Sequence, residues 1–530
     1  MAALPYISVQ PNYADVFSDV SSSTIAGEKV WLSYYSSNAP SSSVHVKLPL
    51  LQTKDDGTSS TQGSVSIGEL ESSGGPPNGL SISRVPGSWL DLSLTQTSPA
   101  NSEDGRSARS LQPNITLDPN ITIRFPKKTL THLLPTQRTS KVNDNYTNHP
   151  TIEAFDLSLG TAVDETDLFV AGGSEGALYT SYLSTFDTDA ARAEALSLLT
   201  PEERDTLAGE SDTKWELEAR VRTHVNAARA RVTKKTALKG HVGDVRCVKF
   251  FPSNRVVLST SSDLTVRVWD AFTGDNPRTF RGHKRAVLAA GIVGRGRTVL
   301  TGGADGSVRL WDVGADKQAR LMGSERFSAA NCLALKQQAE GVEGEQEHFV
   351  VGLASGGWQM FDLRTATASV GGGKYVFPPG EEPGASEVWT QTPTAGVTAI
   401  DVAGNTVVTG TTNGIVSVWD LRHTPSSFSD KTAPPTGLVT AWRRNNAEVN
   451  HLRLTSTPNG LDVLVATQDG LPYRASLAPN EGLYEGGWTG TAPKVVSEYA
   501  GWDCDQTSWI GLDRNGRTVI AGAEGAVRRY

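Results

Sequence analysis

The chain has 530 residues, of which 38% are hydrophobic and 20% are charged, and it contains 52 glycines and 27 prolines. This composition is typical of short strands joined by many turns, together with segments that join no core. The formal net charge of −8 argues against a nucleic-acid-binding surface, which is normally basic, and weakly favours basic protein partners.

The first ten residues contain no basic region followed by an apolar core, and no apolar run in the sequence is long enough to cross a membrane. We therefore expect a protein of the cytoplasm and nucleus without membrane attachment. The three cysteines are far apart and cannot supply a disulfide framework or a paired-thiol zinc site.

Residues 29–35 and 43–50 have the composition of two strands, and strand character returns at 121–125. Between them, residues 53–108 are rich in Ser, Gly and Asp, and most of this stretch buries too little surface to order itself. We predict a small N-terminal β-rich domain at 1–135 with a largely disordered insertion at about 53–108. The 121–125 run, or the run after it, is expected to supply a strand that closes the following domain.

Residues 187–231 are rich in Ala, Glu, Arg and Leu, which favours helix. Thr200-Pro-Glu-Glu203 and Thr213-Lys-Trp-Glu216 both have the spacing of a capping box at a helix start. We predict two or three helices inserted at about 187–231. Such an arm is either a partner-binding element or a tolerated surface insertion.

The strongest pattern is a repeat that is written twice at one constant spacing. Gly240-His241 begins the first copy and Trp269-Asp270 ends it, and both pairs recur in the second copy as Gly282-His283 and Trp311-Asp312. A period of about 40–45 residues with these ends is typical of a four-stranded propeller blade. Because a blade cannot bury its faces alone, two copies predict a ring of blades.

Seven short turns between β-rich runs extend this pattern along the chain. They are Glu175-Gly176, Asp263-Leu264, Asp305-Gly306, Ser355-Gly356, Asn413-Gly414, Asp469-Gly470 and Glu524-Gly525. The sequence therefore predicts an all-β fold, a seven-bladed β-propeller at 136–530 with the helical insertion in its first blade.

Each regular copy carries a His, a hydroxyl, an Asp and a Trp at the same spacing. These side chains can form a buried chain of hydrogen bonds, because an imidazole can donate to a carboxylate and a hydroxyl can accept from an indole N–H. The repetition favours a structural network over a catalytic triad. The predicted network residues are His241, Ser259, Asp263 and Trp269, with His283, Thr301, Asp305 and Trp311.

Three other patterns bear on possible chemistry. Residues 172–176 fit the G-x-S-x-G elbow of a hydrolase around Ser174, but the next residues predict a strand where that elbow needs a helix. Residues 371–374 lack the Ser/Thr and spacing of a phosphate loop, so we expect a linker there. The nine His residues form no ligand pattern, so we expect no metal, no cofactor and no enzymatic activity.

Short stretches of the chain resemble one WD-repeat family, the proteasomal ATPase-associated factor. The similarity is closest over residues 238–314, where Phe250-Phe-Pro-Ser253 and Ile292-Val-Gly-Arg-Gly-Arg297 are its most discriminating motifs. Trp31-Leu-Ser33, Asp503-Cys-Asp505 and the ending Val527-Arg-Arg-Tyr530 are also similar.

This resemblance implies a chaperone for assembly of the base of the proteasome regulatory particle. Its implied partners are the C-terminal domain of an ATPase subunit and assembly intermediates of the regulatory-particle base, and we expect a monomer when the protein is free. The partner-binding rim is expected beside the blade anchors, at Asp244, Ser262, Lys284, Arg285 and Ala304.

A second interpretation is a substrate receptor of a cullin-type ubiquitin ligase. Trp419-Asp420-Leu421-Arg422 resembles the Trp-Asp-x-Arg motif of propellers that dock such ligases. An Arg after Trp-Asp is common in propellers, however, so this motif alone does not decide between the two functions.

Overall fold

The computed structural model describes the ring and parts of the segments attached to it. The described residues are 2–4, 6–10, 16, 27–36, 39–51, 66–67, 71–72, 80–84, 91–96, 121–126, 128–131, 151–158, 168–183, 192, 195–200, 203, 217–225, 235–335, 348–364, 371–374, 395–423, 437–458, 460–477, 493–502, 505–523 and 525–530.

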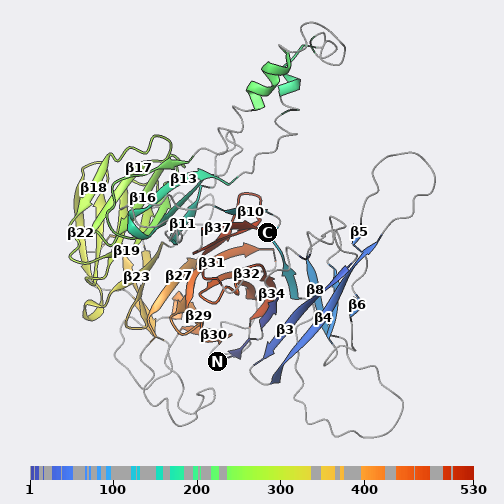
Figure 1. Ribbon diagram of the computed structural model, residues 1–530. Helices are drawn as coiled ribbons and strands as arrows, with labels where there is room; N and C mark the ends of the chain where they lie inside the picture. Colours follow the sequence, from blue (N-terminus) through green and yellow to red (C-terminus); the bar gives the residue numbers. More distant parts are fainter. Residues whose placement is uncertain are drawn as a thin grey trace, which may run out of the picture.

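The predicted seven-bladed propeller is confirmed (Figure 1). Blade one consists of β11 (Ile152–Leu157), β12 (Leu168–Gly173), β13 (Leu178–Tyr182) and β14 (Thr236–Ala237). Blade two consists of β15 (Val245–Phe250), β16 (Val256–Ser261), β17 (Thr265–Asp270) and β18 (Arg278–Arg281). Blade three consists of β19 (Val287–Val293), β20 (Thr298–Gly303), β21 (Ser307–Asp312) and β22 (Lys317–Gly323). Blades four to seven consist of β23 (Ala330–Leu335), β24 (His348–Leu353), β25 (Gly357–Asp362) and β26 (Gly371–Lys374); β27 (Val397–Ala403), β28 (Thr406–Thr411), β29 (Ile415–Asp420) and β30 (Leu438–Arg443); β31 (Val449–Thr457), β32 (Gly460–Thr467), β33 (Tyr473–Leu477) and β34 (Lys494–Tyr499); and β35 (Thr507–Leu512), β36 (Thr518–Gly522) and β37 (Ala526–Arg529), with β10 (Lys128–Thr131) as the fourth strand.

The ring is closed by a strand from the N-terminal part of the chain, as expected. The run after 121–125 supplies it: β10 pairs antiparallel with β37, joining Lys128 to Arg529 and Thr131 to Ala526. The strand β9 (Ile121–Arg124) pairs parallel with β34, so it extends blade six instead. Strands from before residue 135 therefore belong to the sheets of the blades.

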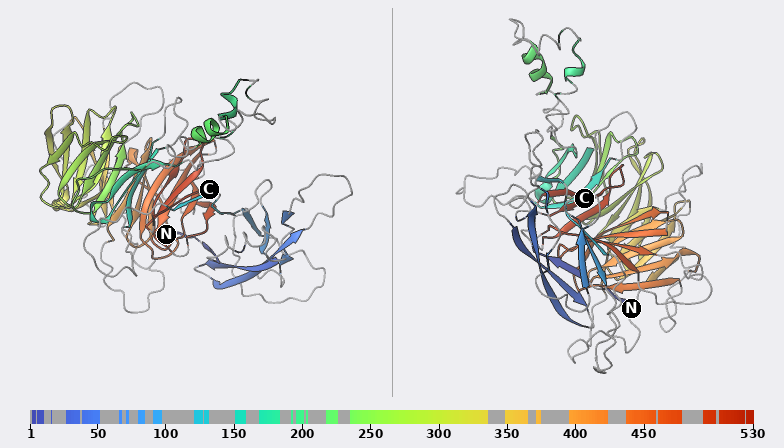
Figure 2. Two further views of the ribbon diagram at one scale, coloured as in Figure 1. Left: turned by 45° about the horizontal axis from the view of Figure 1, so that its top comes forward. Right: turned by 90° about the vertical axis from the view of Figure 1, so that its right-hand side faces the viewer.

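The N-terminal strands form a small sheet beside blades five and six (Figure 2). The two predicted strands are confirmed as β3 (Gly27–Ser36) and β4 (Ala39–Leu51), which pair antiparallel and continue to β2 (Tyr6–Val9), β5 (Ser66–Ile67) and β6 (Glu71–Ser72). Outside this sheet, β7 (Leu80–Arg84) and β8 (Leu92–Gln96) continue the blade-six sheet beyond β9, and β1 (Ala2–Ala3) pairs with β30. The remaining residues of 53–108, where little order is expected, lie outside the described residues.

The helical insertion joins β13 to β14 in the first blade and projects from the ring (Figure 1). Its described residues bury a small core of their own, made of Ala195, Leu199, Leu217 and Val221. The first predicted capping box is present: Thr200 N–H donates to Glu203 Oε2 at 2.9 Å and Glu203 N–H donates to Thr200 Oγ1 at 3.3 Å. The second, at Thr213 to Glu216, lies outside the described residues.

All seven predicted turns join the second and third strands of a blade, and in each the second residue has positive φ. Six of these residues are glycines, with φ of 73°, 72°, 86°, 78°, 72° and 89° at Gly176, Gly306, Gly356, Gly414, Gly470 and Gly525. The seventh is Leu264, with φ 68°. Glycine reaches this region at no steric cost, which is why the dipeptides were such strong turn indicators.

One expectation about the blades was wrong. Residues 371–374, expected to be a linker, form β26, the outer strand of blade four, which pairs Gly371 with Met360 and Lys374 with Gly357. Three successive glycines give little strand propensity. Backbone pairing to the already ordered strand β25 replaces the missing side-chain preference.

The seven first strands line a central channel with a volume of about 680 Å³. Polar side chains on these strands join neighbouring blades: Asn331 Nδ2 donates to the Val397 carbonyl at 3.0 Å, and Asn450 Nδ2 donates to the Thr507 carbonyl at 2.8 Å. Buried apolar side chains fill the space between blades, including Trp358, Trp442 and Trp502, which lie outside the Trp-Asp positions. The ring is therefore held by packing between blades and by bonds across the channel wall.

Candidate functional site

The four predicted network residues of blade two lie in one hydrogen-bonded chain. His241 Nδ1 is 2.8 Å from Asp263 Oδ2, and His241 Nε2 is 2.7 Å from Ser259 Oγ. The Trp269 indole N–H donates to the same Ser259 oxygen at 2.7 Å. Because a carboxylate only accepts, Nδ1 carries the proton, Ser259 donates to Nε2, and its oxygen accepts from the indole.

Blade three repeats this chain at the spacing that the sequence predicts. His283 Nδ1 lies 3.2 Å from both oxygens of Asp305, and Nε2 lies 2.8 Å from Thr301 Oγ1, which also accepts from Trp311 at 2.9 Å. Asp305 also accepts from the backbone N–H of Lys284 at 2.8 Å. The network thus fixes the loop that enters the blade.

The network extends to residues that the sequence interpretation missed. Thr265 Oγ1 donates to Asp263 at 2.6 Å, and Arg267 Nε donates to Thr265 at 3.4 Å. The same contacts occur in blade three at Ser307 and Arg309. All four residues obey the spacing of the repeat, so the repeat itself could have revealed them.

The glycine before each network His has a steric role. A Cβ added at Gly240 would lie 2.4 Å from Arg267 Nη1, and one at Gly282 would lie 2.6 Å from Arg309 Nη1. Both arginines pass over this backbone to reach their polar partners. The glycine of each Gly-His pair is therefore required by the close approach of an arginine side chain as well as by the turn.

Both network carboxylates are held in the charged form. Burial acts to raise the pKa of Asp263, but hydrogen bonds from His241 and Thr265 outweigh it and leave the pKa well below its usual range. At Asp305 the same opposition, with bonds from Ser307 and the Lys284 backbone, leaves a pKa of about 2. Burial also lowers the pKa of His283, so its ring is neutral at pH 7.

Among the described residues, the other blades lack this complete chain. In blade five, Trp419 still donates to Thr409 Oγ1 at 3.3 Å, but no described His completes the network. In blade four, Phe361 stands at the Trp position and Val351 at the hydroxyl position, so neither can bond. The regular repeats therefore fix the loops of blades two and three more firmly than those of the degraded blades.

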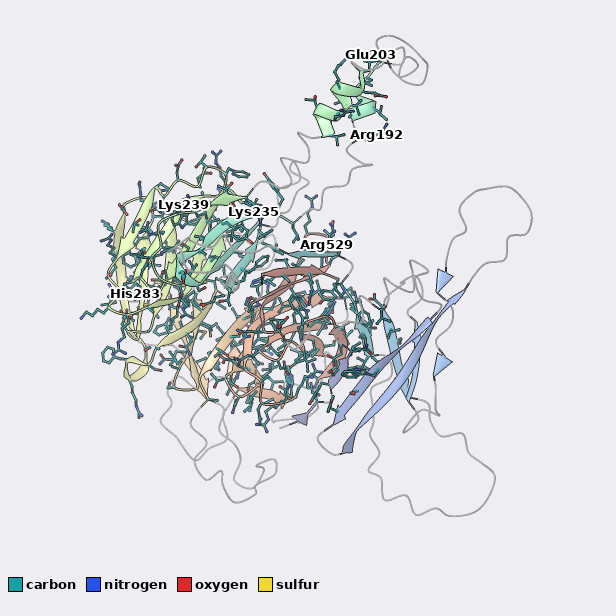
Figure 3. All side chains as sticks on the ribbon, in the orientation of Figure 1. Arg192, Glu203, Lys235, Lys239, His283 and Arg529 are labelled. Carbon is teal, nitrogen blue, oxygen red and sulfur yellow. The ribbon has the colours of Figure 1, made fainter. Side chains whose placement is uncertain are left out.

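The five residues predicted as a partner-binding rim lie together on one side of the ring. They lie in the loops entering β15 and β19 and in the turns after β16 and β20. With the loop entering β23, these segments (residues 240–244, 262–264, 282–286, 304–306 and 324–329) form what we call the rim of blades two to four. His283 marks its position in Figure 3, away from Arg192 and Glu203 on the helical arm.

The rim residues differ in how exposed they are. Lys284 and Arg285 are exposed, whereas Ser262 and Ala304 are half-buried and donate backbone N–H groups to the carbonyls of Asp244 and Ala286 at 2.9 and 2.8 Å. The Asp244 carboxylate accepts from the Glu175 N–H at 3.2 Å and from Arg246 Nη2 at 3.0 Å. Asp244 therefore joins blades one and two, while Lys284 and Arg285 present their charge to solvent.

The structure gives little support to a hydrolase site. Ser174 lies in a 3-10 turn (Ser174–Gly176) that is followed by the strand β13, where a nucleophile elbow needs a helix. Within the described part of the chain, no group of three His, Cys, Asp or Glu side chains could hold a metal ion. Among the same residues, no helix is long and apolar enough to cross a membrane.

The Arg422 corner of blade five has a second copy that the sequence interpretation missed. Arg422 Nε and Nη2 donate to the two oxygens of Asp420 at 3.0 and 2.8 Å. In blade four, Arg364 donates to Asp362 in the same way, at 3.2 and 2.9 Å. Asp362-Leu363-Arg364 follows a Phe rather than a Trp, which hid the similarity.

Comparison with known proteins identifies the regular blades. The model of the WD domain, G-beta repeat, matches residues 232–270 and 274–312. The 26S proteasome regulatory subunit RPN14 of Saccharomyces cerevisiae is 38% identical over 58 residues, which are 11% of this chain and 14% of that protein. Nuclear distribution protein PAC1 of Coccidioides posadasii is 41% identical over 58 residues, which are 11% of this chain and 12% of PAC1.

A fourth similarity is to a ligase component. The probable E3 ubiquitin ligase complex SCF subunit sconB of Arthroderma otae is 48% identical over 46 residues, which are 9% of this chain and 7% of that protein. Each alignment thus spans a small part of the relative's own length. Together with the seven blades and the two repeated networks, these matches show a seven-bladed β-propeller in which blades two and three are WD repeats.

Proposed function

We propose that this WD-repeat protein is a non-enzymatic chaperone for assembly of the proteasome regulatory-particle base, which binds the C-terminal domain of an ATPase subunit. The observation that carries the proposal is the similarity to RPN14, which is itself described as a proteasome regulatory subunit. The family motifs noted in the sequence, such as Phe250-Phe-Pro-Ser253, support it. We place the free protein in the cytoplasm and nucleus as a monomer.

The geometry of the rim suits binding of a partner protein without catalysis. The two networks hold the rim loops of blades two and three in place before any partner arrives, so docking on them would cost little conformational entropy. Exposed Lys284 and Arg285 would supply charge-assisted contacts at that rim. WD-repeat propellers typically serve as such scaffolds.

A direct binding measurement tests this proposal. The full chain is immobilised, and the C-terminal domain of each proteasomal ATPase subunit from the same cells is passed over it. We expect one domain to bind in the micromolar range or tighter, and binding to weaken about tenfold in a Lys284→Ala, Arg285→Ala double variant. Lys317→Ala, on the outer strand β22, is the matched control. If no ATPase domain binds the wild-type chain, the proposal is wrong.

The second candidate is a substrate receptor of a cullin-type ubiquitin ligase. The paired corners favour it: Arg364 and Arg422 lie at equivalent places in adjacent blades, with 59% and 47% of their side chains exposed. In both, the aspartate orients the guanidinium plane, which suits it to a planar contact with a partner. The similarity to an SCF subunit is of the same functional class but covers only 46 residues.

Purified cullin adaptor provides the test of this alternative. An Arg364→Ala, Arg422→Ala double variant should lose adaptor binding if the corners dock it. Arg255→Ala is the matched control, because Arg255 pairs with Asp270 in blade two at 3.1 Å. If neither the wild type nor the control binds the adaptor, the alternative is contradicted and both corners have only the local role of bracing their turns.

A further inference from the structure

An exposed aromatic side chain stands on the rim of blades two to four. Six large apolar side chains are exposed among the described residues, and three lie on this rim: Val242, Leu264 and Phe327, exposed by 85%, 40% and 79%. None of them was predicted from the sequence as an exposed apolar contact. Exposed large apolar side chains that gather on one face are candidates for an interaction site.

Phe327 is held outward by a rigid turn. Ser324 N–H donates to the Gly306 carbonyl at 2.9 Å, and Phe327 N–H donates to the Ser324 carbonyl at 3.1 Å. Ser324 Oγ donates to the Ser328 carbonyl at 2.5 Å, while Ser328 Oγ accepts from Ser355 N–H at 3.0 Å. The turn is thereby fixed to blades three and four together.

The backbone of this turn is strained. Arg326 and Phe327 both have positive φ, 52° and 54°, a region that costs non-glycine residues about 1–3 kcal/mol each. Gly306 permits the arrangement, because a Cβ there would lie 2.3 Å from the Phe327 carbonyl oxygen. Folding alone does not explain a strained turn that exposes a phenyl ring.

Phe327 occupies a position in the ring that is equivalent to that of a network histidine. The turn glycine of blade one meets the carbonyl of His241, and that of blade three meets the carbonyl of Phe327. Phe327 thus stands where blade two has a network histidine. The histidine ring is buried, but blade four offers Val351 and Phe361 in place of its polar partners, so the ring at this position turns outward.

Three exposed cations stand on the same rim as Phe327, although the chain as a whole is negative. Lys284, Arg285 and Arg326 are all exposed on the rim. Of the carboxylates described on the rim, Asp263 and Asp305 are bonded within the networks, with 6% and 9% of their side chains exposed, and Asp244 pairs with Arg246 at 3.0 Å. These three exposed cations can therefore contact a partner although the chain carries a net charge of −8.

We propose that the rim of blades two to four binds an acidic segment of a partner protein that carries a large apolar side chain. Phe327, Val242 and Leu264 supply the apolar contacts, and Lys284, Arg285 and Arg326 pair with the carboxylates that flank the apolar residue. The rigid turn presents the ring without an ordering cost on binding. This inference shares its location with the proposed function, but its test does not depend on an ATPase subunit.

A peptide selection tests the recognition chemistry. Twelve-residue peptides displayed on phage are selected against the full wild-type chain, and the enriched peptides are synthesised and measured by fluorescence anisotropy. We expect Asp and Glu around Leu, Phe or Trp, and affinity that falls as salt is raised. Basic or uncharged selected peptides, or no enrichment at all, would overturn the inference.

Variants locate the binding site. Phe327→Ala, and separately Lys284→Glu with Arg285→Glu, should each weaken the selected peptides about tenfold or more, and Phe327→Tyr should restore most of the affinity. Leu321→Ala, which is 55% exposed on β22, and Lys317→Glu serve as matched controls. Unchanged affinity in Phe327→Ala, with thermal unfolding like that of the wild type, also overturns it. Binding of an ATPase domain is measured separately, so peptides that bind independently of Phe327 would leave the proposed function standing and remove only this inference.

Discussion

The hydroxyl of Ser259 positions two aromatic side chains at once, because it donates to the His241 ring and accepts from the Trp269 indole. All three groups are buried, so each polar atom depends on the others for its hydrogen bonds. Breaking one link in such a buried network leaves a desolvated group unpaired, which is more costly than the average value of a hydrogen bond.

Replacing Trp269 by Phe should therefore be costly. The change removes the indole donor to Ser259 and part of the packed volume, and we expect the free energy of unfolding to fall by about 1–3 kcal/mol. Trp358→Phe is the matched control: Trp358 is equally buried, but its Nε1 has no hydrogen-bond partner among the described residues. Urea unfolding of the two variants compares them. Equal losses would show that volume, and not the network, sets the cost.

Buried histidines predict a loss of stability in mild acid. Burial, aided by the charges of Lys249 and Arg453, holds the pKa of His451 well below its ordinary 6.5, and its neutral Nδ1 accepts from Ile510 N–H at 3.4 Å. The unfolded chain then binds more protons below pH 6.5. The contribution of neutral His451 to the free energy of unfolding is therefore fully present above pH 6.5. It is lost as the pH falls below that value, by up to about 1.4 kcal/mol per pH unit.

The measurement is the free energy of unfolding between pH 7.5 and 5.5. The His451→Asn variant should show a shallower decline than the wild type, because Asn can still accept a hydrogen bond but does not titrate. The decline that remains is expected to include His283, whose pKa burial also lowers. Parallel profiles for the variant and the wild type would contradict the assignment to His451.

Much of the network followed from the sequence, and the reason is repetition. Two copies at a fixed spacing distinguish a structural constellation from a chance one, which is how His241 and Ser259 were paired. Thr265 was missed although it recurs as Ser307, because a Thr-to-Ser change weakens the visible repeat. Phe327 could not be found, because its exposure depends on how two neighbouring blades meet.

At the scale of elements, the turns were the most predictable feature. A glycine after Asn, Asp, Ser or Glu indicates a position that requires positive φ, so the dipeptide alone is enough to predict the turn. Strand β26 was missed because its order comes from pairing with β25, and the three glycines carry no trace of it. Local chemistry therefore predicted turns better than edge strands.

Leu264 is the exception among the turns and yields a prediction. Its φ of 68° is costly for a residue with a Cβ by roughly 1–2 kcal/mol, while glycine loses roughly 0.5–1 kcal/mol through the unfolded state. We expect Leu264→Gly to raise the free energy of unfolding by about 0.5 kcal/mol, the difference between these two effects. Thermal unfolding checks the sign, with Gly306→Leu as the converse variant, which should destabilise strongly because of the Phe327 carbonyl.

The side chain of Leu264 decides whether this prediction holds. It is 40% exposed, so the larger part of its surface already lies against the rim. A lower melting temperature for Leu264→Gly would mean that this packing outweighs the backbone strain. Leu264→Asn separates the two effects, because Asn tolerates the left-handed region but lacks the apolar contact.

For the whole molecule, the blade number was predictable and the attachment of the N-terminal part was only partly so. A closing strand was expected from the need to hide the edges of the first and last blades. The pairing of β9 with β34 was not, because a contact between residues near 123 and 498 leaves no local pattern. The same contact buries Ile123 completely within the blade-six core, so the N-terminal part is built into the ring.

Truncation tests this integration. A chain beginning at residue 136 lacks β9 and β10, whereas one beginning at residue 117 retains both and loses only the strands before them. Four residue pairs join β10 to β37, and at about 1 kcal/mol for each hydrogen bond their loss costs several kcal/mol and exposes the edge of blade seven. We expect the shorter chain to aggregate on size-exclusion chromatography and the longer one to unfold cooperatively as a monomer. If both elute as stable monomers, the three strands β35 to β37 suffice for blade seven, and the N-terminal strand does not lock the ring.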